Sequence, residues 1–447
     1  MTMPNTFTTG LAPGALPLLG HARQLRRQPL PFLESLPGVG DLAEIRLGRE
    51  RVYVPCHPEL VRQVLTDDHT FDRGGALQDH FVELFGECVA TATYRGHRRQ
   101  RRLIQPAFCH DRLEGYAPVV EAEVAALPDS WREGQTFDLF PVLYTLTLRS
   151  VIRMLFSDRV DEATMDEVRR LFLAMTGGAA PRQGVARLIR GTGPTEGRRR
   201  RAAHQLRGVV DRIVADYRRA GETGKDMLSA LLTAREENGG RLDDTEVRNQ
   251  AIIMLAAGSH SPATVLTSVF YLLAEHGGAE HRLHREVDAV LGGRPARWTD
   301  LPDLAFTGRV ITETLRLYAP AWTIFRKTTK EVRLAGRDLP AGTTVLVVPL
   351  IPHRRGDLFD CPREFTPDRW RPECDTVTQR GAFKAFGGGA RKCVGDVLGM
   401  AELKLVVATI ASRWRLECLP DARVRPHAGA VAPPPRYLPV RLVERRP

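Results

Sequence analysis

Lysine is scarce in this sequence. Only six of the 64 basic residues are lysine and the rest are arginine, so the net charge of +11 is carried by arginine. A strongly basic chain can indicate nucleic-acid binding. However, the sequence has no zinc-finger spacing, no aromatic RNA-binding signature and no basic recognition helix, and we therefore expect no nucleic-acid partner. Three of the lysines, Lys384, Lys392 and Lys404, cluster around one cysteine, Cys393.

Paired cysteines and an apolar leader are also lacking. The seven cysteines are scattered, odd in number and without a C-x-x-C pair, so neither a disulfide framework nor a structural zinc site is expected. The N-terminus has no charged segment followed by a long apolar run, and Pro13, Gly14 and Pro17 interrupt it. We expect a soluble, cytoplasmic protein without a membrane partner.

Linkers, repeats and low-complexity tracts are absent as well, which favours a single domain over residues 1–447. The chain is 43% hydrophobic and long enough for a large core. Residues 41–56 and 331–350 show strand patterns, and residues 353–392 read as a long loop. Helical patterns dominate elsewhere and predict a mainly α protein with small β-sheets (α+β); they cover residues 58–65, 118–135, 137–157, 161–176, 197–220, 243–275, 279–291, 304–317 and 394–413.

Two segments of this pattern bear on function. The glycine-rich, basic stretch 177–197 is typical of a mobile connection that acts as a lid. The segment 243–275 is the longest helix: Asp243 and Glu246 have capping-box spacing, and Gly277 and Gly278 can end it. Its middle is apolar nearly all round, so it should cross the core; charged flanks and the GSHSP interruption argue against a membrane span.

The segment from Phe386 to Gly395 carries the strongest chemical signal. Three successive glycines let the backbone pass close to a flat ligand. Cys393 precedes the last helix, whose N-terminal N–H groups favour a thiolate, and Arg391 and Lys392 add positive charge. A thiolate in this setting suits a soft or borderline metal. Taken separately, a lone cysteine is usually structural, and a glycine-rich loop can instead hold phosphate.

The whole string resembles the haem-binding loop F-x-x-G-x-R-x-C-x-G of the cytochrome P-450 family, the haem-thiolate monooxygenases. The resemblance implies a haem b (iron protoporphyrin IX) between the long central helix and the cysteine loop, with Cys393 as its proximal ligand. It also implies that Phe386 packs near the sulfur and that Arg391 pairs with a haem propionate.

Further motifs extend the resemblance over nearly the full chain. Glu313 and Arg316 match the family's E-x-x-R, and 365–370 matches F-x-P-x-R-[FW], whose Arg369 joins them in a buried structural triad. His97 and Arg101 match the family's H-x-x-x-R; four apart, they lie on one helical face and can both reach a haem propionate. Arg326 stands where the family often places another propionate ligand. Alone, E-x-x-R usually marks a solvated helix face, and the basic segment around His97 is open to the same reading.

The central helix departs from the family pattern A-G-x-[DE]-T-[TS]. Gly258 matches, but His260 replaces the acid and Ser261 the threonine, residues that in the family help deliver protons and steady bound dioxygen. Ser261 keeps a hydroxyl and can bond the Ala257 carbonyl. Pro262 has no N–H, so we expect a kink and a free Gly258 carbonyl that water could occupy. His260 could relay protons or could equally pack against a neighbouring helix.

The expected substrate is a hydrophobic small molecule. By resemblance the pocket is lined by apolar and small residues: Leu77, Phe81, Ala257, Ser261, Val265, Trp322, Thr323 and Ile324. The basic segment and the overall layout most resemble actinobacterial members that oxidise terpenes in secondary metabolism, fed by a ferredoxin and its reductase. Two alternatives stay open: a haem-thiolate peroxygenase or isomerase, because the acid–threonine pair is missing, and a haem sensor without turnover.

Overall fold

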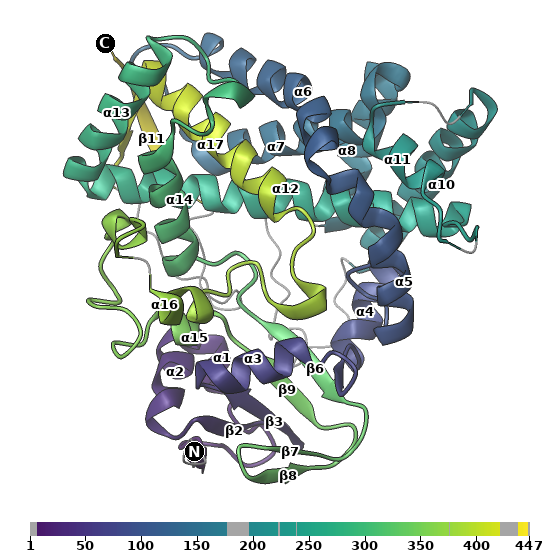
Figure 1. The fold of residues 1–447 in the computed structure, drawn as a ribbon, viewed down its shortest axis with the longest axis vertical. Helices are drawn as coiled ribbons and strands as arrows, with labels where there is room; N and C mark the ends of the chain where they lie inside the picture. The colour runs from purple at the N-terminus through teal and green to yellow at the C-terminus, as the bar shows by residue number, and fades with distance from the viewer. Residues whose placement is uncertain are drawn as a thin grey trace.

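The computed structural model describes residues 7–176, 196–221, 224–237, 239–374, 376–420 and 437–445. The connection expected at 177–197 therefore lies almost wholly outside the described residues. Helices dominate the described part; the six-stranded and two-stranded sheets lie at the bottom of Figure 1, and the three-stranded sheet β10-β11-β5 (Trp414–Cys418, Pro439–Glu444 and Thr136–Asp138) lies at the opposite end, beside the C-terminus. This is the mainly helical α+β class that the sequence predicts.

The helices and strands have the following bounds. The helices are α1 (Ala22–Arg27), α2 (Pro29–Ser35), α3 (Pro58–Thr66), α4 (Ala76–Phe85), α5 (Tyr94–Ile104), α6 (His110–Asp129), α7 (Leu139–Phe156), α8 (Glu162–Thr176), α10 (Glu196–Arg219), α11 (Met227–Thr233), α12 (Asp244–Glu275), α13 (Gly277–Leu291), α14 (Ala305–Leu317), α15 (Leu350–His353), α16 (Val377–Ala382) and α17 (Asp396–Arg413). The strands are β1 (Thr9–Leu11), β2 (Leu42–Leu47), β3 (Glu50–Pro55), β4 (Phe71–Asp72), β5 (Thr136–Asp138), β6 (Ile324–Thr328), β7 (Val332–Leu334), β8 (Arg337–Leu339), β9 (Thr344–Val347), β10 (Trp414–Cys418) and β11 (Pro439–Glu444).

The largest sheet joins the N-terminal strands to strands from far along the chain, in the order β1-β2-β3-β9-β6-β4. Side chains alternate between its faces as strand geometry requires. In β9, Val345 and Val347 pack into one hydrophobic cluster and Leu346 into another. The sheet therefore has an apolar layer on each face and forms the lower part of the molecule in Figure 1.

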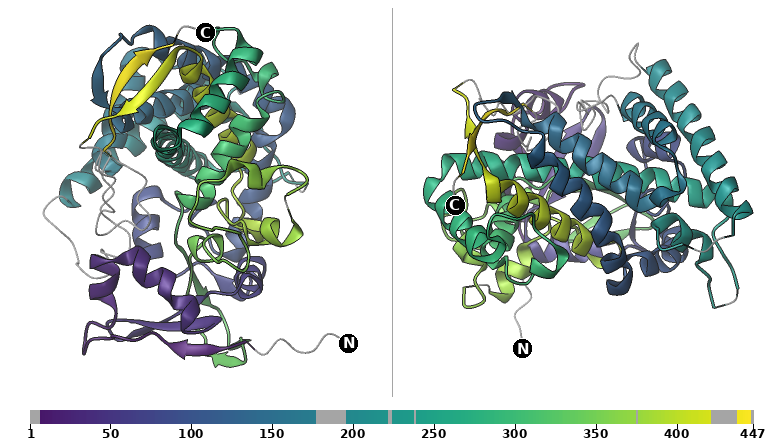
Figure 2. Two further views of the ribbon diagram at one scale, coloured as in Figure 1. Left: turned by 90° about the vertical axis from the view of Figure 1, so that its left-hand side faces the viewer. Right: turned by 90° about the horizontal axis from the view of Figure 1, so that it is seen from above.

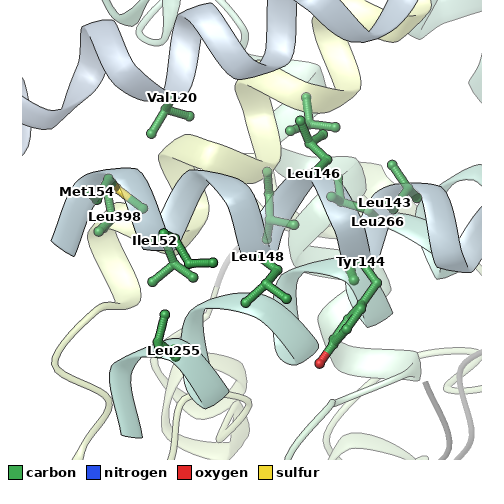
Figure 3. Close-up of a cluster of buried hydrophobic side chains, with 14 of the residues drawn as sticks. Val120, Leu143, Tyr144, Leu146, Leu148, Ile152, Met154, Leu255, Leu266 and Leu398 are labelled. Atoms are coloured by element: carbon green, nitrogen blue, oxygen red, sulfur yellow. The ribbon is translucent and has the colours of Figure 1, made fainter. Parts of the chain in front are cut away.

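Helix α12 crosses the helical part of the molecule, with α7 and α17 packed against it (Figures 1 and 2). The predicted capping box is present: Glu246 N–H donates to Asp243 Oδ1 over 2.8 Å, and Asp243 N–H donates to Glu246 Oε2 over 3.0 Å. Figure 3 shows leucine, isoleucine and methionine side chains of α7 packed between α12 and α17. Helices α7 and α12 are long and apolar enough to cross a membrane, but 72% and 67% of their apolar windows are buried inside the fold. They are core helices.

Some boundaries differ from the sequence prediction. The helix expected at 118–135 is α6, which begins at His110 because its buried face, Leu113, Tyr116 and Val120, continues across Pro118. Gly277 and Gly278 do not end α12. His276 caps α12, and the next helix, α13, begins at Gly277. The expected loop 353–392 contains the short helix α16.

Candidate active site

The cysteine loop is held tightly against α3. The Cys393 N–H donates to the Phe386 carbonyl over 3.0 Å, which closes the loop. Gly389 has a φ of +66°, and a Cβ there would lie 2.1 Å from the Leu65 carbonyl oxygen, so only glycine fits. Gly387 has a φ of +74°, which also favours glycine. The glycines thus let the loop pass close to α3, while Cys393 stays open to a cavity that Leu65 of α3 also lines.

Burial raises the pKa of the Cys393 thiol, and Asp396 adds to that effect. The backbone N–H of Gly395 and the positive charges of Arg101 and Lys392 lower the thiol pKa, but by less than burial raises it. The sequence points to the helix N–H groups, Arg391 and Lys392 as favouring a thiolate, but it gives no measure of burial. The protein by itself therefore stabilises the thiolate less than the sequence predicts.

The cavity has a volume of about 340 Å³ and lies between the cysteine loop and α12. Helix α12 lines it with Ala257, Gly258, Ser261 and Val265. Gly258 is required here, since a Cβ would lie 2.9 Å from Val151 Cγ2 of α7. Most of the remaining wall is apolar: Leu65, Phe108, Val151, Met154, Met227, Met254, Leu315, Pro320, Ala321, Ile324, Leu398 and Leu403.

Three arginines, Arg73, Arg326 and Arg391, gather on one side of this cavity. Arg391 donates to Asp72 Oδ1 over 2.6 Å, and Arg326 donates only to the neighbouring Phe325 carbonyl over 3.0 Å. The Nε atoms of all three are buried and have no hydrogen-bond partner. Burial, and then the other arginines, lower the pKa of Arg73 to about 10 and that of Arg326 well below its usual value.

This group requires an anion. Asp68 and Asp72 face the three arginines, so positive charge is in excess, and buried charge is costly unless it is paired. His97 lies beside them with its Nδ1 unpartnered, and burial followed by Arg391 lowers its pKa to about 3. A flat ligand with carboxylates, as haem has, fits these donors and the adjacent open cysteine.

The structure does not bring Arg101 into this group. Its Nη1 donates to the Lys392 carbonyl over 2.6 Å, and it does not line the cavity. Arg101 therefore braces the cysteine loop from outside. Arg73 belongs to the group of buried arginines instead. The sequence did not suggest this role, since no short motif marks Arg73.

Helix α12 runs unbroken through Pro262. The Ser261 hydroxyl does not bond the Ala257 carbonyl; it is Ser259 that donates one turn back, to Leu255 over 2.6 Å. Ser261 instead lines the cavity. The His260 ring makes edge contacts with Phe140 and Tyr144 of α7, at centroid distances of 6.1 and 6.2 Å, and does not line the cavity. This placement favours packing over proton relay for His260.

The expected triad is assembled in the core. Glu313 accepts from Arg316 Nε and Nη2 over 2.8 and 2.7 Å and from Arg369 Nε over 3.0 Å. The Glu313 and Arg316 side chains are both fully buried. The triad does not line the cavity, so it supports the fold and takes no part in binding.

The expected pocket residues divide into three groups. Ala257, Val265 and Ile324 line the cavity. Phe81 is 43% exposed on α4, and neither Trp322 nor Thr323 lies among the lining residues. The side chain of Leu77 lies outside what the structure describes. The wall instead includes Met154, Met227 and Met254, which no sequence pattern singled out.

Comparison with known proteins agrees with this geometry. The cytochrome P450 family model matches residues 11–439. The chain is 44% identical to pentalenene oxygenase of Streptomyces avermitilis, covering 99% of both chains, and 45% identical to cyclooctat-9-en-7-ol 5-monooxygenase of Streptomyces melanosporofaciens, covering 93% of this chain and 91% of that one. The cytochrome P450DA heme domain shares the fold, with a TM-score of 0.86 at 21% identity and 99% coverage of each chain. The chain therefore belongs to the cytochrome P450 family and is a haem-thiolate monooxygenase.

Proposed function

We propose that this chain is a cytoplasmic enzyme that inserts one oxygen atom of O2 into a terpenoid in secondary metabolism, with haem b as cofactor and a ferredoxin and its reductase as electron donors. One observation carries the proposal. A single cavity is lined by the open Cys393, by Ser261 of the central helix and by an apolar wall.

The residues that would hold haem b are the free cysteine and the buried polar side chains with atoms that lack hydrogen-bond partners. Cys393 would ligate the iron, and the lining residues Arg73, Arg326 and Arg391 would donate to the propionates. His97, which lies beside these arginines but does not line the cavity, would add its unpartnered Nδ1. Phe386 lines the same cavity beside the thiol. Bound there, the haem supplies oxygen activation, which the thiolate promotes by donating electron density to iron.

The proposed substrate class follows from the wall of the cavity. Among the described residues that line it, the polar side chains are the propionate-side arginines, Cys393, Ser261 and one buried carboxyl, so these residues offer no further charged group to anchor a substrate. Three methionines adapt their shape easily to a compact hydrocarbon. The relatives named for pentalenene and cyclooctat-9-en-7-ol indicate a terpenoid.

The roles of the central-helix residues follow from their placement. The Ser261 hydroxyl, open to the cavity, can orient water or donate a proton there. The Gly258 carbonyl cannot bond forward to Pro262, which has no N–H, so it can hold such a water. His260 holds α12 against α7.

The proposed docking face for an acidic ferredoxin contains fewer residues than the cluster of basic residues around Cys393 in the sequence. Lys392 is 54% exposed at its side chain and pairs with Asp396, and Lys384 lies near it in sequence. Arg391 is only 3% exposed and belongs to the cavity. Lys404 donates to the Leu301 carbonyl over 2.9 Å and packs on Gly308, so it is not a docking residue.

The test combines ligation with turnover. The reduced, carbon monoxide-treated protein should show the long-wavelength Soret band of thiolate-ligated haem. Cys393→Ala should abolish the band, whereas the exposed control Cys361→Ala should keep it. Terpene hydrocarbons that shift the Soret band should gain one oxygen from labelled O2 when reduced ferredoxin is present. Turnover with hydrogen peroxide alone would instead indicate a peroxygenase, and binding without any conversion would indicate a sensor.

A further inference from the structure

His353 of α15 is a histidine that the site described above does not use. It is fully buried and does not line the cavity. Helix α15 packs against α14, the helix that carries the triad residues Glu313 and Arg316 (Figure 1). Arg316 Nη1 donates to the His353 carbonyl over 2.8 Å, so the triad fixes the backbone at His353.

Both ring nitrogens of His353 are hydrogen-bonded, each to the backbone of a different segment. Nδ1 lies 3.1 Å from the Arg316 carbonyl oxygen, and the Lys384 N–H donates to Nε2 over 2.8 Å. Because a carbonyl only accepts and an amide N–H only donates, one neutral tautomer, with its proton on Nδ1, satisfies both. Burial, followed by the charge of Arg316, lowers the pKa of His353 to about 3, which agrees with a neutral ring.

The bond to Lys384 leads directly into the cysteine loop. The Lys384 carbonyl accepts from the Gly387 N–H over 2.9 Å, which forms a tight turn. Phe386 lies inside this turn, and its carbonyl accepts from the Cys393 N–H over 3.0 Å. His353 therefore holds the first residue of the turn that in turn holds Cys393.

Two aromatic rings support the imidazole from the side. Phe383 stacks on the His353 ring at a centroid distance of 5.3 Å and an angle of 17°. Trp370 packs edge-on against Phe383 at 5.1 Å, and its Nε1 donates to Glu313. The imidazole is thus connected to the triad twice, through its bond to Arg316 and through this pair of rings.

We propose that His353 is a positioning residue that couples the cysteine loop to the buried triad and so holds the Cys393 sulfur in place toward the haem. Without the Nε2 acceptor, the Lys384 N–H would be unpaired inside the protein, which is costly. The turn would then shift or admit water to satisfy this N–H, and Cys393 would lose its fixed position. The inference rests on the proposed ligation of haem by Cys393 and needs no particular substrate.

Two variants separate the two bonds of the ring. Glutamine places its amide near the position of Nε2, so His353→Gln keeps an acceptor for the Lys384 N–H. Asparagine is shorter and places its amide near Nδ1, so His353→Asn keeps the bond to Arg316 and loses the bond to Lys384. Hydrogen exchange of the Lys384 amide in the holoenzyme should be roughly 5–30-fold faster in His353→Asn, as expected for one lost buried hydrogen bond, and nearly unchanged in His353→Gln. Equal exchange in the two variants would overturn the proposal.

The second measurement follows the sulfur ligand and the fold separately. In a urea titration of the reduced, carbon monoxide-treated protein, the long-wavelength Soret band reports the thiolate on iron, and circular dichroism reports the helices. The midpoint for the Soret band should fall further below the helical midpoint in His353→Asn than in the wild type or in His353→Gln. The same separation of midpoints in all three proteins would mean that His353 acts only on overall stability, and the proposal would fail.

A matched control is available in His21, which joins N-terminal segments and does not line the cavity. His21 is also fully buried and stacks on Phe32, at a centroid distance of 5.3 Å and an angle of 24°. Its Nε2 donates to the Ala12 carbonyl over 3.0 Å, and its Nδ1 accepts from the Arg46 N–H over 2.9 Å. His21→Asn should lower the helical midpoint without separating the two midpoints further. A separation as large as that in His353→Asn would overturn the proposal.

A milder variant serves if His353→Asn does not fold. Phe383→Leu removes the ring stacked on His353 and should speed exchange of the Lys384 amide by a smaller factor, and unchanged exchange there would count against the proposal. If the wild type shows no long-wavelength Soret band, the proposed ligation by Cys393 fails, while exchange of the Lys384 amide still tests whether His353 holds the turn.

Discussion

Replacing Glu313 by glutamine tests the buried triad most directly, because both oxygens of the carboxylate accept several hydrogen bonds. Its Oε1 accepts from Arg316, Arg369 and the Thr366 N–H, and its Oε2 accepts from Arg316 and Trp370 Nε1 over 2.8 Å. A glutamine NH2 in either orientation faces at least two N–H donors. The isosteric change therefore removes charge and also creates a repulsive contact.

The expected cost follows from burial. Removing one partner of a buried ion pair typically lowers the free energy of unfolding by about 3–5 kcal/mol. Arg316 keeps three carbonyl acceptors, those of His353, Pro362 and Glu364, so the lower part of that range applies. At roughly 1 °C per kcal/mol for a chain of this size, unfolding should shift downward by roughly 3 °C.

The assay is thermal unfolding of haem-loaded protein at one fixed scan rate. The control is Glu59→Gln, which breaks an exposed pair with Arg62 at side-chain exposures of 46% and 58% and should cost under about 1 kcal/mol. Trp370→Phe removes one of the donors and should cost roughly 1.5–3 kcal/mol, which gives a milder variant if Glu313→Gln does not fold. The reasoning is refuted if Glu313→Gln unfolds together with the Glu59→Gln control.

Three further predictions concern chemistry, docking and pH. Ser261→Ala should keep fold, haem and substrate binding but release more peroxide per electron, while Ser261→Thr should be tolerated; full coupling in the alanine variant would assign proton delivery to water on the free carbonyl alone. Changing both Lys384 and Lys392 to Glu should slow reduction by ferredoxin and weaken its salt dependence, and unchanged rates would place docking elsewhere. Burial, followed by Arg316, lowers the pKa of His353 from 6.5 to about 3, so the unfolded state binds the extra proton below pH 6.5. Stability should then fall by up to about 1.4 kcal/mol per pH unit as pH drops from about 6 toward 3, and urea titrations of His353→Gln should lack this contribution.

Features that depend on neighbouring residues could be predicted well. The capping box at Asp243 and Glu246 formed as expected because both partners lie within one helical turn. The cysteine loop could be recognised because its glycines and Cys393 follow one another in the chain. Pairing of Glu313 with Arg316 likewise needs only a spacing of three on a helix.

Features that depend on convergence of distant segments could not be predicted. Arg73, Arg326 and Arg391 come from three separate parts of the chain, and only the first lacked a motif to suggest it. Lys404 is close to Cys393 in sequence but points toward Leu301 and Gly308. The ring of His260 was expected to face either the cavity or a helix, and the packing of α7 decided which.

The sequence by itself determined the cysteine loop, the long apolar helix and the pairing of Glu313 with Arg316, since short-range spacing and helix periodicity specify these. Only the family resemblance added Arg369 to that pair. Tertiary structure decided where charge is left unpaired. Whether a carboxyl such as Glu402 is a neutral acid or a solvated anion depends on how much water the surrounding helices exclude, and this in turn depends on α7, α12 and α17 meeting around it. Desolvation is a property of packed neighbours, most of them distant in the chain, and so it is absent from any local pattern.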